Sequence, residues 1–427
     1  MKALKYVSSY WRDIFLQASG NTIAQIVGVL GIPLLSRLYA PQEFAVQNIF
    51  LQLVMFFAGI MTWRYEYFFQ MLKDDQQARW LFSGVLRLGI VIGVLLTVAL
   101  YVFSAQIAQL LSLEQGVNLL VVAPISALLV SLALAFQHNA QRLGAYKISA
   151  LSEVFGKSAY VASGALLAAV TTSGLLFTTL FSALGKIGAL LPYSKSIISG
   201  SCAHAPDAVS PLKKHASGAN ALVMSHVLVT VSSAAPVFYI SAVYGTEILG
   251  QFSMVMATIF LPSGLVGAAI GQVFYQRAAL HAEEPLVLKG LWNMTIRKLA
   301  LFGIPIYLCA GILSPWIYPF VLGGQWHDAG LYAQVLMVAA LSAFVSTPLD
   351  RVSLVLRYNW YLPSLHVFRL MATGVLLSLA THLALDFEDF LLFYVVQVSA
   401  VYLLDLLFAH FLIRHAARKG ATTMEEV

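Results

Sequence analysis

Long apolar runs alternate with short polar gaps along the whole of this 427-residue chain. A helix that spans a bilayer needs about 20 consecutive, predominantly apolar residues, and we identify twelve runs of this kind. The pattern therefore predicts an all-α polytopic membrane protein with twelve transmembrane helices. The predicted spans are residues 13–36, 43–63, 80–107, 117–137, 146–170, 174–197, 218–243, 247–276, 296–320, 329–350, 361–384 and 389–413.

The longest polar gap, residues 199–217, divides these spans into six and six. We therefore expect an N-terminal six-helix bundle over residues 1–198, a linker over 199–217, and a C-terminal six-helix bundle over 218–427.

The eighth predicted span, residues 247–276, carries unusually many helix-disrupting residues for its length. Pro262 lies near its middle, and the glycines at 250, 264, 267 and 271 are spread along it. Membrane helices tolerate such residues where neighbouring helices satisfy the freed backbone groups. The composition predicts a helix that can bend.

Composition and charge placement support this interpretation. The chain is 59% hydrophobic and only 10% charged, whereas soluble domains carry about 25% charged residues. Twenty of the 25 Lys and Arg residues fall in the two tails, in alternate gaps or within three residues of the adjoining span ends, and only Arg37 falls in the opposite set of gaps. This asymmetry predicts that both termini and the linker are cytoplasmic. The net charge of +6 reflects these short gaps and does not indicate a nucleic-acid partner.

Four basic residues fall inside predicted spans and more than three residues from their ends: Lys157, Lys186, Arg87 and Arg369. A charge at mid-span costs about 2.5–3.5 kcal/mol, so it needs a partner, water or a function. The buried acids are fewer, Glu153 and Asp405, so the excess predicts a cationic cavity that binds an anionic substrate. We add Arg37 to this set. Two alternatives stay open: Arg87 and Arg369 can extend to the lipid headgroups, and Glu153 can pair with Lys157 one turn later.

Polar residues also recur at helical spacing within several spans. Asn21 and Gln25 share a face of the first span, and Ser182 lies one turn before Lys186 in the sixth. We expect these three side chains to line the cavity. His226, Asp405 and Glu153 are candidates for proton coupling or for structural pairing. Ordinary hydrogen bonding between helices is the alternative for each of these polar residues.

The sequence has no catalytic or cofactor-binding constellation. It lacks the phosphate-binding loop of ATPases, and none of its gaps holds a His/Cys/Asp cluster with metal-ligand spacing. Asp386, Glu388 and Asp389 form an acidic outer gap, which we interpret as a solvated connector. We therefore expect no enzyme activity, no metal and no cofactor.

Two stretches resemble the bacterial polysaccharide repeat-unit flippases, members of the superfamily that also holds the MATE drug exporters and lipid II flippases. Residues 34–44, LLSRLYAPQEF, are similar to the end of that family's first helix and the turn after it, with Ala45 where glycine is usual. Residues 249–277, LGQFSMVMATIFLPSGLVGAAIGQVFYQR, are similar to its eighth helix.

This resemblance implies two six-helix bundles that face each other as a V and open alternately to either side of the inner membrane. It implies a substrate in which an oligosaccharide is linked through diphosphate to a polyprenol. A polysaccharide polymerase and a chain-length regulator are the implied protein partners.

Two other functions are weighed against this one. An ion-coupled multidrug exporter of the same fold predicts a cavity dominated by acidic and aromatic residues, whereas here the cations outnumber the acids. A polysaccharide polymerase or O-antigen ligase is also polytopic, but it is expected to carry a large periplasmic loop, and the predicted outer gaps are short.

Overall fold

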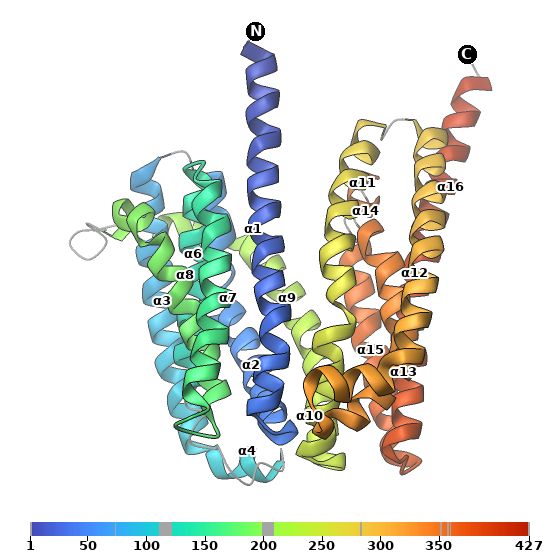
Figure 1. Ribbon diagram of the computed structural model, residues 1–427. Coiled ribbons are helices and arrows are strands. Elements are labelled where there is room, and N and C mark those ends of the chain that lie inside the picture. Colours follow the sequence, from blue (N-terminus) through green and yellow to red (C-terminus); the bar gives the residue numbers. More distant parts are fainter. Residues whose placement is uncertain are drawn as a thin grey trace. The chain divides into compact units, whose positions relative to one another are not determined.

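The computed structural model describes residues 2–72, 74–110, 122–198, 209–281, 284–350, 352–356, 358 and 360–425, nearly all of them helical. These residues contain no β-strand, which confirms the all-α class (Figure 1). The chain forms two compact units, Met1–Gly250 and Gln251–Val427. The boundary falls inside one helix, α10 (Thr246–Ile259).

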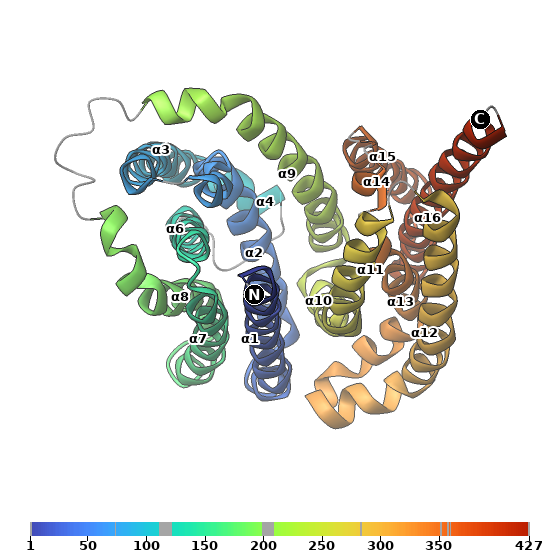
Figure 2. The same cartoon turned by 90° about the horizontal axis from the view of Figure 1, so that it is seen from above.

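The first unit is built around α1, α7 and α8, with α2 and α6 beside them (Figure 2). Its other helices, α3 and α9, also pack on α2. The elements are α1 (Lys2–Leu38), α2 (Pro41–Met61), the 3-10 helix η1 (Tyr65–Met71), α3 (Asp75–Val102), α4 (Ser104–Leu110), α6 (Ala123–Arg142), α7 (Tyr146–Leu167), α8 (Gly174–Ile198) and α9 (Val209–Tyr244).

Glycines allow α1, α7 and α8 to approach closely. A Cβ atom on Gly20 of α1 would lie 2.3 Å from the Cβ of Ala150 on α7. One on Gly185 of α8 would lie 3.0 Å from the carbonyl oxygen of Phe155 on α7. Membrane helices associate through such small residues, because close contact replaces the hydrophobic driving force that lipid does not provide.

The turn between α1 and α2 explains most of the first family-like stretch. Pro41 begins α2, where a missing N–H is harmless, and the Glu43 carboxylate accepts a hydrogen bond from the Ala40 N–H at 2.7 Å. The buried Tyr39 hydroxyl donates to the carbonyl oxygen of Gly164 on α7 at 2.7 Å. The turn is thereby fixed to the neighbouring helix.

The two family-like stretches meet at this turn. A Cβ atom on Gly250 of α10 would lie only 1.9 Å from the carbonyl oxygen of Pro41, so no larger residue fits without moving the backbone. Nearby, the Gln42 side-chain amide donates to the Glu247 carboxylate at 3.1 Å. The start of α10 is therefore packed directly on the start of α2.

The second unit centres on α12, α13 and α16. The remainder of α10 and the helices α11 and α15 complete it, together with several short elements. They are η2, a π-helix (Ser263–Gly267), α11 (Ala268–Leu280), α12 (Pro285–Leu322), the 3-10 helix η3 (Gly324–Trp326), α13 (His327–Ser346), the 3-10 helix η4 (Thr347–Leu349), α14 (Val352–Val355), α15 (Tyr361–His382) and α16 (Phe387–Glu425).

The eighth predicted span is interrupted rather than continuous. α10 ends at Ile259, a turn and Pro262 follow, and η2 leads into α11. Proline removes a backbone donor and clashes with the preceding turn, which accounts for the local widening into a π-helix. The Tyr307 hydroxyl of α12 donates to the Ile259 carbonyl oxygen at 3.3 Å and lies 3.2 Å from the Ser263 hydroxyl. A neighbouring helix thus satisfies the polar groups at the break.

Ten helices in the described part of the chain are long and apolar enough to cross a membrane. The two further predicted spans coincide with α7, which carries Glu153 and Lys157, and with the interrupted pair α10 and α11. The polytopic class is therefore confirmed. The count of twelve, the cytoplasmic termini and the division at residues 199–217 stay predictions, and residues 199–208 of the linker lie outside the described ranges.

Candidate functional site

The strongest polar cluster inside the helices joins α7 to α8. The Lys186 Nζ atom lies 2.9 Å from both oxygens of the Glu153 carboxylate. The Gln137 side-chain amide, from α6, donates to the same carboxylate at 3.0 Å. The Lys186 and Glu153 side chains are 26% and 21% exposed, so this ion pair is mostly but not fully shielded.

Lys157 lies beside this pair without sharing its carboxylate. Its Nζ atom is 5.5 Å from the centre of the Tyr160 ring, a cation–π arrangement, and the side chain is exposed. Its aliphatic carbons pass Gly28 of α1, where a Cβ atom would be 3.7 Å from Lys157 Cδ. Within the described residues, the direct ion pair of Glu153 is therefore with Lys186 on another helix, and Lys157 makes no direct ion pair with this carboxylate.

Gly156 makes the interhelical pair possible. The Lys186 side chain crosses α7 at this position, and a Cβ atom on Gly156 would lie 2.7 Å from Lys186 Cγ and 2.9 Å from Cε. Gly156 lies one turn after Glu153, so the aliphatic chain of Lys186 that crosses α7 there brings the Lys186 ammonium group to the Glu153 carboxylate.

Substituting Gly156 with alanine is expected to displace Lys186. Overpacking of this kind costs about 1–3 kcal/mol, so Gly156→Ala is expected to lower the free energy of unfolding by about this amount. The transport rate should also fall several-fold, because Lys186 is displaced. Gly188→Ala is the control, because nothing lies within 4 Å of a Cβ built on that α8 residue. Equal export by the two variants would contradict the close passage of Lys186 over Gly156.

A second polar node lies farther along α7. The Gln47 amide nitrogen of α2 lies 2.6 Å from the Tyr160 hydroxyl and 3.2 Å from the Thr178 Oγ1 atom of α8. Gln47 and Thr178 are buried. This node holds Tyr160, and therefore the ring under Lys157, in a fixed position.

The predicted lining residues lie nearby on α1 and α8, with different surroundings. Asn21 is exposed, and Gln25 is half-buried with an Oε1 atom that has no hydrogen-bond partner among the described groups. Ser182 is half-buried one turn before Lys186. Their roles as lining residues stay predictions.

Arg37 and Arg87 are not brought to the lysine cluster. Arg37 is exposed in the last turn of α1, about 13 Å along the helix axis beyond Gly28. Arg87 lies on the exposed side of α3, followed by the exposed apolar residues Ile90, Val91 and Val94. This environment favours extension of Arg87 towards the headgroups.

Arg369 and Asp405 belong to the second unit. The Arg369 guanidinium lies 5.2 Å from the centre of the Tyr402 ring. Asp405 is buried and accepts hydrogen bonds from the Ser346 hydroxyl at 2.6 Å and the Tyr361 hydroxyl at 2.5 Å. These hydrogen bonds join α13, α15 and α16, so the structural pairing predicted for Asp405 would be with the hydroxyl groups of Ser346 and Tyr361.

The sequence did not single out Arg64 and Glu66, which the structure connects to His226. Arg64, in a left-handed conformation with φ of 58°, lies between α2 and α3, and its guanidinium contacts the Nδ1 atom of His226 on α9. The other ring nitrogen of His226 lies 3.0 Å from the Met55 carbonyl oxygen. A guanidinium can only donate, so His226 accepts at Nδ1 and carries its proton on Nε2.

Glu66 completes this group. It is fully buried, lies 3.5 Å from the Arg64 guanidinium, and leaves its Oε2 atom without a partner among the described groups. The sequence did contain a signal for Glu66: it is an acidic residue within the aromatic stretch Tyr65–Phe69, and such a stretch is expected to be buried. Burial raises the pKa of the Glu66 carboxyl, and hydrogen bonds from Thr62 and the backbone, with the nearby Arg64, only partly oppose this.

The Glu66 carboxyl is expected to make stability depend on pH. Its pKa is raised in the folded state, so the folded protein binds a proton more tightly than the unfolded chain does. The resulting stability is fully present below the ordinary value of 4.5 and is lost as the pH rises through the raised pKa. Thermal unfolding measured across this range should show the loss, and Glu66→Gln should reduce it. An unchanged pH profile in that variant would assign the dependence to other groups.

The structure describes no group of His, Cys, Asp or Glu side chains that could hold a metal ion within its ranges. The chemistry that the described cluster offers is electrostatic: two ammonium groups, of which one is paired with the Glu153 carboxylate, and neutral amides and hydroxyls.

The fold is that of the transporters and flippases of the MOP superfamily. A lipid II flippase, MurJ, in an inward closed conformation is similar at a TM-score of 0.73 and 13% identity, over 93% of this chain and 87% of that chain. An inward-facing MATE family multidrug resistance transporter is similar at 0.69 and 12% identity, over 94% and 96%. A MOP superfamily transporter from Pyrococcus furiosus reaches 0.60 at 12% identity, over 95% and 96%.

The sequence places the protein more narrowly. The family described as polysaccharide biosynthesis protein matches residues 34–331, and the chain belongs to this family. No curated protein matches the chain significantly. The resemblance stated from the two family-like stretches is therefore confirmed at the level of the family, and the solved structures add the fold.

Proposed function

We propose that the protein is a flippase that moves a polyprenyl-diphosphate-linked oligosaccharide across the bacterial inner membrane by alternating access. The oligosaccharide would be a repeat unit of O-antigen, capsule or exopolysaccharide. Membership of a polysaccharide biosynthesis family and a fold shared with a lipid II flippase support a lipid-linked substrate. A polysaccharide polymerase and a chain-length regulator remain the proposed protein partners.

The observation that carries this proposal is the charge of the α7–α8 cluster. Lys157 and Lys186 lie with one carboxylate, Glu153, so the three groups leave one net positive charge. In surroundings of low dielectric constant, this charge attracts an anion much more strongly than it would in water. A diphosphate fits this site better than a cationic drug does.

The geometry suggests how the site could both bind and release a diphosphate. Lys157 is accessible and held over Tyr160, so it can make the first contact with the anion. Lys186 can then transfer from Glu153 to the phosphate, because both partners are anionic oxygens. On release, Glu153 takes Lys186 back, and the empty site does not keep an uncompensated ammonium group.

The ion-coupled drug exporter is less well supported by the described acids. Glu153 is paired with Lys186, and Asp405 accepts hydrogen bonds from two hydroxyl groups. Neither is a free carboxylate of the kind that a cationic substrate requires.

Reconstituted proteoliposomes test the proposed function. The expected result is protein-dependent transfer of a polyprenyl-diphosphate oligosaccharide between leaflets, without transport of fluorescent cationic dyes. Dye transport that is insensitive to Lys186→Ala, with no transfer of the lipid-linked sugar, would establish the exporter instead.

A further inference from the structure

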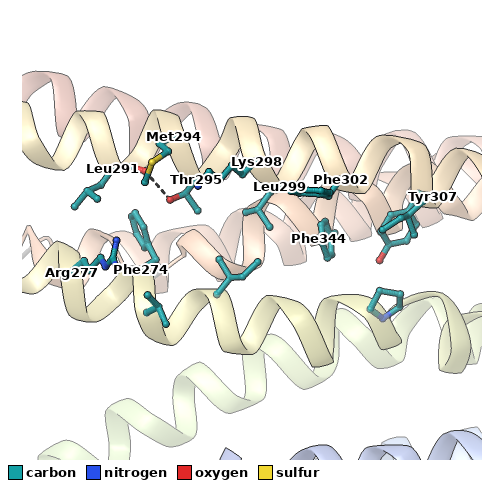
Figure 3. Close-up of a pocket in the computed structure, with 14 residues that line it drawn as sticks. Phe274, Arg277, Leu291, Met294, Thr295, Lys298, Leu299, Phe302, Tyr307 and Phe344 are labelled. Atoms are coloured by element: carbon teal, nitrogen blue, oxygen red, sulfur yellow. Dashed lines mark hydrogen bonds between the residues drawn. The ribbon is translucent and has the colours of Figure 1, made fainter. Parts of the chain in front are cut away.

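The second unit holds an apolar groove between α11 and α12 (Figure 3). Its volume is about 660 Å³, and its walls include Phe274, Leu299 and Phe302 together with the cations Arg277 and Lys298. A phospholipid and a polyprenyl chain fit such walls equally well, so the groove does not identify a ligand. The polar node at His226 in the first unit is more specific, because each of its contacts has a defined donor and acceptor.

The His226 ring of α9 is held between the backbone of α2 and the Arg64 guanidinium. Gly59 leaves room for the ring, since a Cβ atom at that position would overlap it. The Nε2–H group of His226 donates to the Met55 carbonyl oxygen at 3.0 Å, and Arg64 donates to Nδ1. These two hydrogen bonds together require the neutral imidazole, because the imidazolium form has no acceptor. The ring is half-buried, so water can reach it.

Arg64 has a second acceptor within reach, the buried carboxyl group of Glu66. The Nη1 atom of Arg64 lies 3.5 Å from Oε1 of Glu66, and Oε2 has no partner among the described groups. A hydrogen bond from a guanidinium to a carboxylate is stronger than one to a neutral acceptor. A small movement of the Arg64 side chain can therefore exchange His226 for Glu66.

The backbone beside this node is strained. Trp63 and Arg64 both have left-handed conformations, with φ of 50° and 58°. Residues with a Cβ atom rarely adopt such angles, and they keep them only where surrounding contacts hold them. The partner of the Arg64 side chain is one of these contacts, so a change of partner acts directly on the connection between α2 and η1.

Two further hydrogen bonds attach the earlier part of α9 to the same connection. The Tyr65 hydroxyl donates to the Leu212 carbonyl oxygen at 3.0 Å, and the Trp63 indole N–H donates to the Asn220 side chain at 2.7 Å. Of these attachments, only that of His226 changes its charge between about pH 5 and pH 8. Pro236 follows within α9, and a proline allows a helix to bend. The middle of α9 can therefore move while its earlier part stays attached.

Other titratable or charged groups lie on the elements packed around this node. They are Tyr65 and Tyr67 of η1, His138 and Arg142 of α6, Lys213 and His215 of α9, and Asp75, Arg79 and Arg87 of α3, while α2 carries only Glu43 near its opposite end. The His138 ring stacks on Tyr67 at 4.9 Å and is influenced by the Arg64 charge, and His215 stacks on Phe68 at 4.7 Å. Within the described residues, Arg64 is the charged group that contacts His226.

We propose that His226 is a proton-binding site at which one proton transfers Arg64 from α9 to Glu66. The proton binds from water to the lone pair of Nδ1, which ends the hydrogen bond from Arg64 and places two cations side by side. An Arg64 N–H group then donates to Oε2 of Glu66, whose ionised form the guanidinium favours. The imidazolium keeps its bond to Met55 alone, so the middle of α9 is less restrained and can bend away from α2 at Pro236.

The consequence for transport rests on the proposed function. In a flippase that works by alternating access, a less restrained α9 would make the exchange between conformations faster at low pH. The proton site itself can be tested without a substrate.

Electron paramagnetic resonance of the full-length protein in proteoliposomes tests the movement. Spin labels replace Leu51 of α2 and Val231 of α9, which are both exposed, after the native Cys202 and Cys309 have been changed to serine. The expected result is one distance at about pH 8 and an additional, longer distance at about pH 5, the range in which histidine titrates.

Two variants remove the response in different ways. His226→Gln keeps an acceptor for Arg64 and a donor for Met55 but does not titrate, so the short distance should remain at both pH values. Arg64→Gln removes the cation that repels the imidazolium, so the longer distance should again not appear on acidification.

The neighbouring histidines are the matched controls. His215→Gln and His138→Gln should both keep the pH response, because neither side chain accepts a hydrogen bond from Arg64 in the structure. Glu66→Gln should shift the appearance of the longer distance to lower pH, because Arg64 then lacks an anionic acceptor. A response that is absent from the wild type, or that persists in His226→Gln, overturns the proton site. An unshifted response in Glu66→Gln overturns the transfer of Arg64.

Flipping of a polyprenyl-diphosphate oligosaccharide, with equal pH on both sides of the membrane, separates this inference from the proposed function. Flipping by the wild type should be several-fold faster at about pH 5 than at about pH 8, and His226→Gln should lose this difference. A protein that flips the lipid but shows no pH-dependent distance overturns the proton site alone. A pH-dependent distance in a protein that does not flip overturns the proposed function and leaves the proton site. The absence of both overturns both.

Discussion

Replacing Lys157 or Lys186 with alanine is expected to lower export of the lipid-linked oligosaccharide about tenfold or more. Each substitution removes one charge-assisted contact to the diphosphate, which is worth about 1.5–3 kcal/mol. Lys186→Ala also leaves Glu153 as an unpaired carboxylate, so the site changes from net positive to neutral. Accumulation of the precursor on the inner leaflet, measured in cells that depend on this protein for export, reports the loss.

Lys147→Ala is the matched control for this experiment. Lys147 is a lysine on the same helix, in the first turn of α7, and its side chain is exposed. The Lys147→Ala variant should export the lipid-linked oligosaccharide normally, and all three variants should reach the membrane in similar amounts. Normal export by both Lys157→Ala and Lys186→Ala would refute the diphosphate site.

Glu153→Gln is expected to destabilise the protein by about 1–3 kcal/mol. Breaking a buried ion pair from one side costs about 3–5 kcal/mol, and the partial exposure of Lys186 and Glu153 reduces this value. The double variant Glu153→Gln with Lys186→Met should recover most of the thermal stability, because no shielded charge is left without a partner. It should not recover export, because the anion site has lost Lys186.

A second double variant tests which lysine is the partner. Glu153→Gln with Lys157→Met should recover little stability, because the structure places Lys157 over Tyr160 and not on the carboxylate. If this combination rescued stability and the one with Lys186→Met did not, the pair across α7 and α8 would be wrong.

The transmembrane spans could be predicted because the lipid environment restricts both the backbone conformation and the side chains of a span. Backbone groups in lipid must bond within the helix, and side chains that face lipid must be apolar, so length and composition are sufficient. The same reasoning marked Pro262 and its neighbouring glycines as a place to bend, and the structure has a π-helix there. The turn within the family-like stretch 34–44 could also be predicted, because it depends on local contacts such as the hydrogen bond from the Ala40 N–H to the Glu43 carboxylate.

The pairing of the charges could not be predicted in the same way. Spacing along α7 made Lys157 the natural partner of Glu153, since residues four apart share a face. The pairing actually depends on Gly156, which lets the Lys186 stem cross α7. Arg64 and Glu66 were missed for a similar reason, because the contact to His226 joins residues 162 positions apart.

The sequence by itself determined the all-α membrane class, the location of the apolar helices and the presence of more cations than acids within them. These properties follow from transfer of single residues between water and lipid, which depends on each residue's own chemistry. Only the tertiary structure decided that Lys186 is neutralised by Glu153, that Arg87 lies on an exposed apolar face, and that Arg277 and Lys298 line one groove. Those outcomes depend on which helices approach closely, and close approach is set by contacts between residues far apart in the chain.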